Sequence, residues 1–397
     1  MEERFTEENY LLQLLSESLK KKDEHTQTIL HNETLDWDKF LTVAENHAVL
    51  SLLYDRLMEE ALSEENRKRT ERVSRRVVQQ SYHLLFFSRY VIELLQQQGI
   101  QVVLLKGPAI SCYYPVPELR KSGDVDLLLL DKDKLAQAGK IFKEAGFCVE
   151  KKQITNHHLA VETPQGIEIE LHTMLAEPFE NDEINRYLEQ TALEMKYHVQ
   201  EKDIMGIRLP VLSDAYNAYY LLIHMLQHFL REGFGLKLLC DWVVFWNSNI
   251  SEEEVQGYQK LIKESRLEGF SRMITSLCIH FLGLKDIGLC SLLPKETSRE
   301  FMKDILEAEE FGKSNRERML VLQGTGISDY MREFQHQMHL NYPNAGKIWI
   351  LWPLLWIATL IRFLYNNRKI RKTSSIKIFR QAEKRSWMLK QLKLFQK

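Results

Sequence analysis

Two aspartates at the start of an apolar run are the residues best suited to chemistry. Asp124 and Asp126 are separated by one residue, and four leucines follow them at 127–130. Because side chains of a strand alternate between faces, a strand here would place both carboxylates on one face. Two neighbouring carboxylates repel each other, and Mg²⁺, which prefers carboxylate and phosphate oxygens, would remove that repulsion. For this pair alone, a strand edge with two solvated acids is the commoner explanation.

The residues upstream change that preference towards a metal-dependent phosphate site. Residues 101–105 predict a short buried strand, which ends at a turn containing Gly107. Backbone N–H groups at such a turn can hold phosphate oxygens, and nearby cationic side chains offset phosphate charge. A basic loop then leads into Asp124. The residues predicted to bind the nucleotide are Lys106, Gly107, Arg120, Ser122 and Gly123.

The order of several motifs resembles the polymerase-beta-like nucleotidyltransferase superfamily, in particular a poorly characterised bacterial branch of it. The motifs are Leu-Lys-Gly at 105–107, Tyr-Pro at 114–115, Arg-Lys-Ser-Gly-Asp-Val-Asp-Leu at 120–127, Ala-Gly-Phe at 145–147 and Glu-Leu-His at 170–172. Pro108 departs from the superfamily, which has Gly or Ser there, and it removes one N–H donor. The resemblance implies an α+β fold in which a small mixed β-sheet nucleotidyltransferase core is flanked by N-terminal and C-terminal helical regions.

A third carboxylate is expected on a later strand that lies beside the two aspartates. Residues 159–162 and 167–171 predict a hairpin, and Glu168, Glu170 and His172 share one face of its second arm. Alternation leaves Glu168 and Glu170 as competing choices, and the resemblance selects Glu170. His172 is either a contact to the metal-binding acids or the substrate, or a structural histidine.

The resemblance implies transfer of a nucleoside monophosphate from an NTP, with ATP as the first choice, and release of pyrophosphate. Asp124 and Asp126 would bind one Mg²⁺, with Mn²⁺ as the alternative metal. Glu170 would complete a second metal site and take the acceptor's proton. The acceptor stays open among a small metabolite, a sugar phosphate, a peptide or protein, and an RNA end.

Two other functions are weighed against this one. The first is a nucleotide-binding module without turnover, which only Pro108 supports. The second is a membrane-associated scaffold that acts through the C-terminal tail. The three acids and the glycine turn favour the active enzyme over both.

Helical patterns flank the predicted core. They divide the chain into a helical region at 1–98, a catalytic core at 99–205, a helical domain at 206–345 and an apolar and basic helical segment at 346–397. In the third region two histidines lie four residues apart on one helix face, but Met225 replaces the glutamate of a zinc-binding H-E-x-x-H motif. A packed pair of core histidines is the preferred explanation for them. The candidates for contact with the acceptor or with the metal-binding residues are His172, His224, His228, Lys237 and Asp241.

Composition agrees with an intracellular enzyme. The chain of 397 residues is 44% hydrophobic and carries a net charge of −2, which shows no overall bias towards nucleic acid. Its five cysteines contain no C-x-x-C pair, so we expect free thiols without a disulfide partner and no zinc site. The acidic N-terminus is unlike an ordinary signal peptide. We therefore expect a cytoplasmic location.

The C-terminal segment combines an apolar run with a basic tail. Residues 348–364 are rich in Trp, Leu and Ile but contain Pro353, and this length barely reaches the roughly 17 residues of a membrane span. Residues 362–397 hold 12 Lys and Arg against one Glu, a net charge of +11. A buried helix followed by a basic helix that binds an anionic acceptor is preferred. An interfacial helix in peripheral membrane contact comes next, and a membrane span last.

Overall fold

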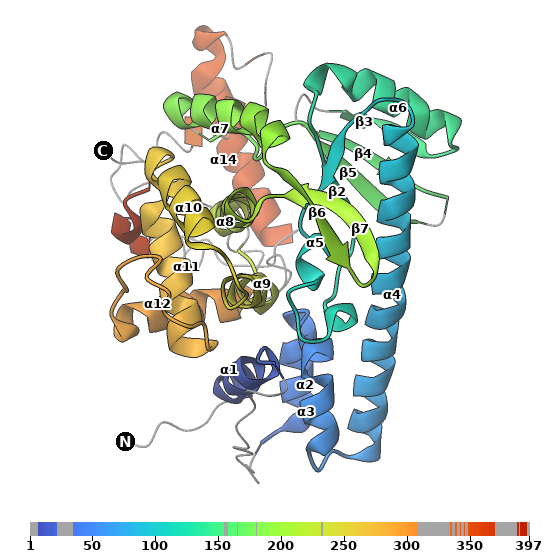
Figure 1. Cartoon of the computed structure of the whole chain (residues 1–397). Coiled ribbons are helices and arrows are strands. Elements are labelled where there is room, and N and C mark those ends of the chain that lie inside the picture. The colour runs from blue at the N-terminus through green and yellow to red at the C-terminus, as the bar shows by residue number, and fades with distance from the viewer. Residues whose placement is uncertain are drawn as a thin grey trace.

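A seven-stranded mixed sheet lies between helical regions of the chain in the computed structural model shown in Figure 1. The predicted α+β class, with a mixed sheet flanked by N-terminal and C-terminal helices, is confirmed. The residues that the structure describes are 7–21, 35–154, 158–164, 166–179, 181–231, 233–308 and 348–369, with short stretches within 334–345 and 387–394.

The sheet has the strand order β3-β4-β5-β2-β1-β7-β6. Its central strand, β2, pairs antiparallel with β1 and parallel with β5, and β1 also pairs parallel with β7. The strands are β1 (Val102–Leu104), β2 (Val125–Leu129), β3 (Cys148–Ile154), β4 (His158–Glu162), β5 (Glu168–His172), β6 (Val199–Ile204) and β7 (Ile207–Leu212). The sheet thus extends beyond residue 205, and the division of the chain into four regions stays a prediction.

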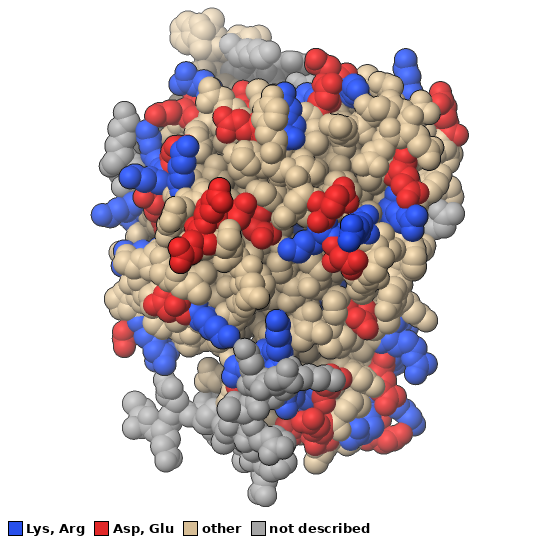
Figure 2. All heavy atoms as spheres, viewed as in Figure 1, with Lys and Arg blue, Asp and Glu red and all other residues tan. Residues whose placement is uncertain are grey.

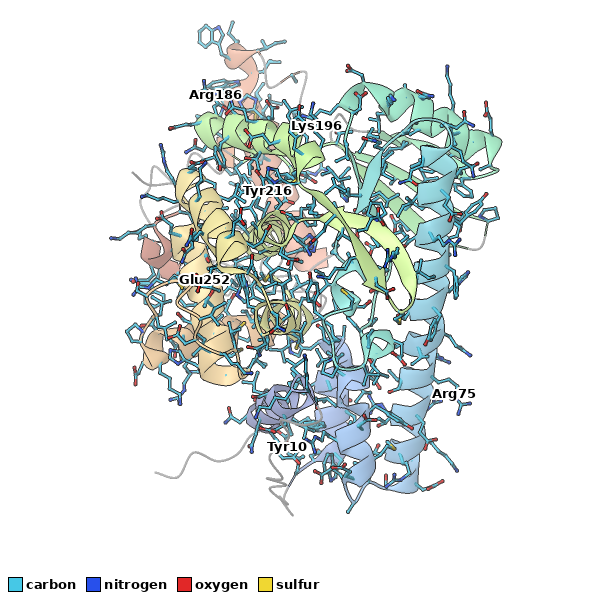
Figure 3. All side chains as sticks on the ribbon, in the orientation of Figure 1. Tyr10, Arg75, Arg186, Lys196, Tyr216 and Glu252 are labelled. Carbon is cyan, nitrogen blue, oxygen red and sulfur yellow. The ribbon has the colours of Figure 1, made fainter. Side chains whose placement is uncertain are left out.

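The first helices build one end of the molecule, and the longest of them continues from there along the sheet (Figure 1). Ser63 caps the longest of them, α4, because its hydroxyl accepts a hydrogen bond from the N–H of Asn66 at 3.2 Å. Figure 3 labels Tyr10 at the foot of the molecule, where its hydroxyl donates to Glu60 Oε1 at 2.8 Å. These helices are α1 (Glu7–Ser18), α2 (Trp37–Asn46), α3 (Tyr54–Glu59) and α4 (Glu64–Gln96).

The remaining helices connect the strands or follow them. Those between strands are α5 (Pro108–Ser111), α6 (Leu135–Glu144) and α7 (Asp182–Glu194). Those after the sheet are α8 (Asp214–Arg231), α9 (Leu236–Trp246), α10 (Glu252–Glu264), α11 (Glu268–Phe281), α12 (Lys295–Ala308) and α14 (Trp352–Lys369). Short 3₁₀ helices span Leu50–Leu53, Pro117–Leu119, Lys132–Lys134, Met195–Tyr197 and Trp349–Leu351.

The two faces of the sheet pack against different helices. Leu127 of β2 belongs to an apolar cluster that includes Phe142 of α6 and buried residues of α4. Leu128, on the opposite face, belongs to a second cluster that joins the N-terminal helices to α8 and α9. Because side chains alternate along a strand, Asp126 points to the same side as Leu128. The carboxylates of the sheet therefore face the helices that follow it in the chain.

Helix α14 is not the buried helix that the sequence favoured. Leu354 is 68% exposed and Ile361 is 61% exposed, so the preferred prediction of a core helix is wrong for this segment. Pro353 does not interrupt the helix, since it occupies the first turn, where a backbone N–H has no partner within the helix. No helix in the described part of the chain is long and apolar enough to cross a bilayer. Within the basic tail, residues 370–386, 389 and 395–397 lie outside the described residues.

Candidate active site

The register of two neighbouring strands brings a pair of predicted acids together. In the parallel pairing of β2 with β5, Asp126 lies opposite Glu170, and Leu128 lies opposite His172. The side chain of Asp126 is fully buried, that of Glu170 is 30% exposed and that of His172 is 20% exposed. The site therefore has a buried floor at Asp126 and an open side at Glu170.

Two basic side chains lie among the carboxylates. Nε2 of His172 lies 3.0 Å from Oδ1 of Asp126 and 3.3 Å from Oε2 of Glu170. Nζ of Lys106 lies 3.0 Å from the same Asp126 oxygen and 4.0 Å from Oδ2 of Asp124. A single carboxylate oxygen of Asp126 thus contacts both bases.

The turn after β1 aims Lys106 at this cluster. The N–H of Leu105 donates to the carbonyl oxygen of Asp126 at 2.9 Å, which fixes the end of β1 beside the aspartate. Gly107 follows with a φ of +48°, in the region that favours glycine because other residues place a Cβ in steric conflict there. The glycine turn predicted from the sequence is therefore present, and it directs the lysine towards the acids.

Opposite charges determine the protonation of the cluster. Burial alone would lower the pKa of Lys106, but the nearby carboxylates, above all that of Asp126, raise it. Burial also disfavours a charged His172, yet hydrogen bonds to Asp126 and Glu170 raise the pKa of His172 to about 9. Burial opposes ionisation of Asp126, and the two bases nevertheless lower its pKa below the usual range. At neutral pH two cations therefore offset the buried carboxylate.

The other two predicted acids lie in different environments. Burial and the charge of Asp126 raise the pKa of Asp124, while Lys237 of α9 lies close enough to oppose that shift. Glu168 is exposed, and its pKa is raised by its own partial burial and then by the charge of Glu170. Among the described residues, neither Asp124 nor Glu168 is part of the group of possible metal ligands. The strand register places Glu170 opposite Asp126, and the choice of Glu170 over Glu168 as the third acid stays a prediction.

Helix α8 covers the carboxylates with aromatic and histidine side chains. Burial lowers the pKa of His224 well below its usual value, and the charges of Lys106 and His228 lower it further, so the His224 ring is neutral. The rings of His224 and His228 meet edge to face, with centroids 4.5 Å apart. Tyr220 lies four residues before His224 on the same helix face. Burial raises its pKa, and the charges of Lys106 and Asp126 act on it as well. Sequence reasoning missed this tyrosine, although the four-residue spacing in α8 pointed to it.

Arg120 joins the loop before β2 to helix α9. Its Nε and Nη2 atoms each donate to a carboxylate oxygen of Asp241 at 2.7 Å, and its Nη1 donates to Oγ of Ser122 at 2.6 Å. The hydroxyl of Tyr114 donates to Asp241 as well, at 2.7 Å. Arg120 is only 3% exposed and Asp241 only 1%. In this arrangement the guanidinium contacts protein groups, and Asp241 lies beneath the loop rather than at the open side of the site.

The carboxylates fit a divalent cation. One buried oxygen of Asp126, Oδ2, has no hydrogen-bond partner among the described residues. An unpaired buried carboxylate oxygen is energetically unfavourable, and a bound cation would supply the missing partner. Ligand atoms of Asp126, Glu170 and His172 all lie within 4.8 Å of one another. Carboxylate oxygens suit Mg²⁺ and Mn²⁺, and His172 would join them as a ligand only in its neutral form, because a protonated imidazole cannot bind a metal.

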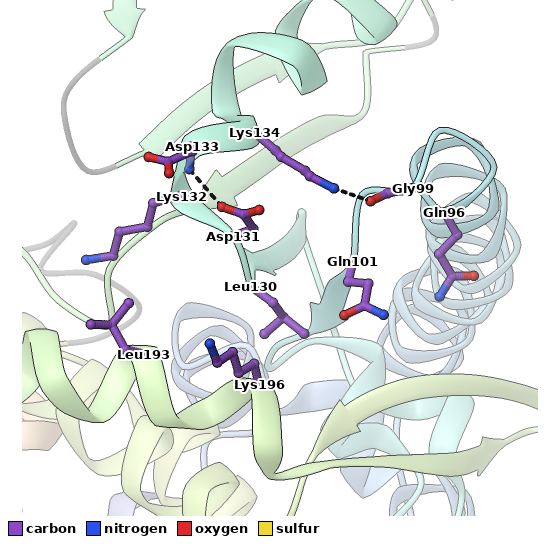
Figure 4. A pocket seen from close by; sticks show the side chains of 10 residues that line it. All are labelled: Gln96, Gly99, Gln101, Leu130, Asp131, Lys132, Asp133, Lys134, Leu193 and Lys196. Carbon is purple, nitrogen blue, oxygen red and sulfur yellow. Dashed lines mark hydrogen bonds between the residues drawn. The ribbon is translucent and has the colours of Figure 1, made fainter.

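A separate pocket lies at the opposite end of β2 from Asp126. It has a volume of about 930 Å³, and none of the clustered residues lines it (Figure 4). The residues lining the pocket are Gln96, Gly99, Gln101, Leu130, Asp131, Lys132, Asp133, Lys134, Leu193 and Lys196.

Acidic and basic side chains are interspersed over the face of the molecule in Figure 2.

Comparison with protein families identifies the general class of the molecule. A family described as an uncharacterised nucleotidyltransferase matches residues 33–283, which include the sheet, α8 and α9. The chain belongs to this nucleotidyltransferase family. A search of the curated proteins finds no match. The match spans both the carboxylate cluster and the Arg120–Asp241 pair, so the family region contains the whole candidate site.

Asp241→Ala should destabilise the protein by about 3–5 kcal/mol, because it leaves the guanidinium of Arg120 buried without its counter-ion. The matched control is Glu93→Ala, which removes the partner of Arg89 in a pair whose side chains are 50% and 53% exposed. That change should alter stability by at most about 1 kcal/mol. Urea unfolding followed by circular dichroism measures both. Similar small losses in the two variants would mean that the buried pair does not stabilise the site.

Proposed function

We propose that this protein is a Mg²⁺-dependent nucleotidyltransferase that transfers a nucleoside monophosphate from an NTP, with ATP as first choice, to an acceptor hydroxyl or phosphate. The main support is the pairing of Asp126 with Glu170 on adjacent strands, together with the partnerless buried oxygen of Asp126. Family membership supports nucleotidyl transfer as the general activity and an NTP as the donor. The acceptor is a small metabolite, a sugar phosphate, a peptide or protein, or an RNA end.

Asp124 and Asp126 would hold the cation at the triphosphate, and Glu170 would complete a second metal site on the side of the acceptor. Mg²⁺, or Mn²⁺ in its place, supplies positive charge at the triphosphate oxygens. Lys106 adds a further positive charge at the same place, since its ammonium group already contacts two of these carboxylates. His172 orients Asp126 and Glu170 through the hydrogen bonds that it makes to both.

The reaction forms a bond between an acceptor oxygen and the α-phosphorus of the NTP. The bond from the α-phosphorus to the oxygen shared with the β-phosphate breaks, and pyrophosphate leaves. Where the acceptor is a hydroxyl, its proton passes to a base. We assign that role to Glu170, because its carboxylate is partly exposed and a hydrogen bond from His172 keeps it ionised by lowering its pKa.

The loop around the triphosphate has two kinds of residue. Gly107, Ser122 and Gly123 are assigned to close contact with the phosphates, and no heavy atom lies within 4 Å of where a Cβ would stand on Gly123. For Arg120 we propose a role other than the phosphate contact that the sequence predicts. Because its guanidinium is buried against Asp241, we infer that it positions the loop.

Residues of the covering helices lie near the carboxylate cluster, where Tyr220 is buried and Lys237 is half-buried. Tyr220 and Lys237 lie close enough to influence the charges of the carboxylate cluster, and we assign them to substrate contact. His224 stays neutral, so it can accept or donate one hydrogen bond without adding charge. His228 packs against it and supports its orientation.

Asp126→Asn should weaken Mn²⁺ binding by at least about tenfold, because it removes the charge of the central ligand. The matched control is Asp133→Asn, since Asp133 is an exposed acid at the other end of β2. Titration of the paramagnetic signal of free Mn²⁺ measures the affinity without any need for turnover. Equal affinity in Asp126→Asn and Asp133→Asn would place the metal elsewhere.

Glu170→Gln should lower the transfer rate by about 10²–10⁴-fold and leave nucleotide binding little changed, because the proposed role of Glu170 is towards the acceptor. Glu168→Gln on the same strand face is the matched control, and it should keep most of its activity because Glu168 is exposed and outside the cluster. Release of pyrophosphate measures the rate. Loss of activity in Glu168→Gln alone would reverse the assignment of the third acid.

A further inference from the structure

The C-terminal apolar segment, defined as residues 348–361, exposes a concentration of apolar side chains. Trp349 is 72% exposed, Ile350 67% and Leu354 68%. Exposed apolar side chains that are scattered singly are ordinary, but a contiguous group marks an interaction surface. The other large hydrophobic side chains exposed in the segment are those of Ile348, Ile357, Leu360 and Ile361.

The exposed side chains share one face of α14. Leu354, Ile357 and Ile361 follow the i, i+3, i+7 spacing of a helix face. The opposite face is attached to the protein, because Thr359 is only 3% exposed and Nε1 of Trp356 donates to Gln335 at 2.6 Å. One end of the helix projects beyond α7 at the top of Figure 1. The apolar face is therefore held outward by contacts on the other side.

The composition of the segment favours contact with a lipid bilayer over contact with water. Between 348 and 361 the sequence has no charged residue, and Thr359 supplies its only hydroxyl. These residues would make a helix of about 21 Å, shorter than the roughly 30 Å of a hydrocarbon core. The segment is thus too short to span a bilayer and too apolar for a solvated surface, which is the character of an interfacial helix.

The distribution of charge along the chain indicates which kind of surface the segment would bind. The tail at 362–397 carries +11, whereas the whole chain carries −2, so residues 1–361 carry −13. An anionic surface would attract the positive charge of residues 362–397. A nucleic acid would neutralise the tail but would leave the apolar face of α14 uncovered. A membrane with anionic headgroups satisfies both features.

We propose that the C-terminal apolar segment lies in the interface of an anionic lipid membrane, to which the positive charge of residues 362–397 attracts it. Leu354, Ile357 and Ile361 enter the acyl boundary, and Trp349 lies at headgroup level, where amphipathic indole rings concentrate. This surface is independent of the carboxylate site, because none of its residues belongs to that cluster. The membrane proposal therefore does not depend on whether the protein catalyses nucleotidyl transfer.

Flotation of the full-length protein with lipid vesicles tests the proposal. Vesicles of phosphatidylcholine that also contain phosphatidylglycerol should carry the protein upward, and phosphatidylcholine alone should carry much less. Added NaCl should release it, because salt screens the headgroup charge. Leu354→Glu/Ile357→Glu should lose most of the binding. The matched control is Tyr82→Glu/Phe86→Glu, which changes two side chains of α4 that are 40% and 59% exposed and should bind like the unaltered protein.

Quenching by brominated phospholipid provides a test that does not depend on folding of the charged variant. Indole emission of the unaltered protein should fall on binding, and Trp349→Phe should show less quenching at equal binding. Equal flotation of Leu354→Glu/Ile357→Glu and the α4 variant would overturn the proposal, as would no binding of the unaltered protein to anionic vesicles. A dimer in sedimentation that Leu354→Glu/Ile357→Glu converts to a monomer would overturn it too, since a second chain would then cover the face.

Discussion

Charge compensation of the buried carboxylate of Asp126 is the constraint on which the site depends. An ionised carboxylate removed from water is unfavourable by several kcal/mol unless it is paired and hydrogen-bonded. Lys106 and His172 provide that pairing through a single oxygen, and the other oxygen keeps no partner among the described residues. Bases so arranged keep the acids ionised and clustered, which is the state that a divalent cation requires of its ligands.

The backbone around Asp126 follows from the same requirement. Lys106 reaches the aspartate because β1 ends beside it and turns at Gly107. Glu170 and His172 reach it because β5 runs parallel to β2 in the register that places Glu170 opposite Asp126. A slip of one residue in that register would turn both side chains to the apolar face, against α4 and α6. The apolar cluster on that face therefore holds the acids in place as much as their own contacts do.

A second buried ion pair connects the sheet with the helices that cover it. Arg120 stands just before β2, and Asp241 lies in α9, more than a hundred residues later in the chain. The bidentate contact between them is geometrically restrictive, so it fixes how α9 lies against the loop before Asp124. Lys237 belongs to the same helix, and its charge acts to lower the pKa of Asp124. The position of the covering helices is thus coupled to the geometry of the carboxylates.

Local patterns predicted much of the sheet and placed its candidate acids on one face. Alternation placed Glu168 and Glu170 on one face, and it could not decide between them because that depends on which residue of β5 lies opposite Asp126. The partnership of Arg120 with Asp241 was beyond prediction, because it arises from packing between distant segments. The exposure of α14 was missed for a related reason: apolar composition indicates that a surface will be covered, but it does not indicate by what.

Incubation with each of the four NTPs, labelled either at the α-phosphate or at the γ-phosphate, tests the central claim most directly. With Mg²⁺ and cell extract present, the account predicts that α-label becomes attached to an acceptor while γ-label appears in pyrophosphate, and that Asp126→Asn abolishes both. Identification of the labelled species then names the acceptor. Transfer of γ-label to an acceptor, or transfer of α-label that survives Asp126→Asn, would contradict the account.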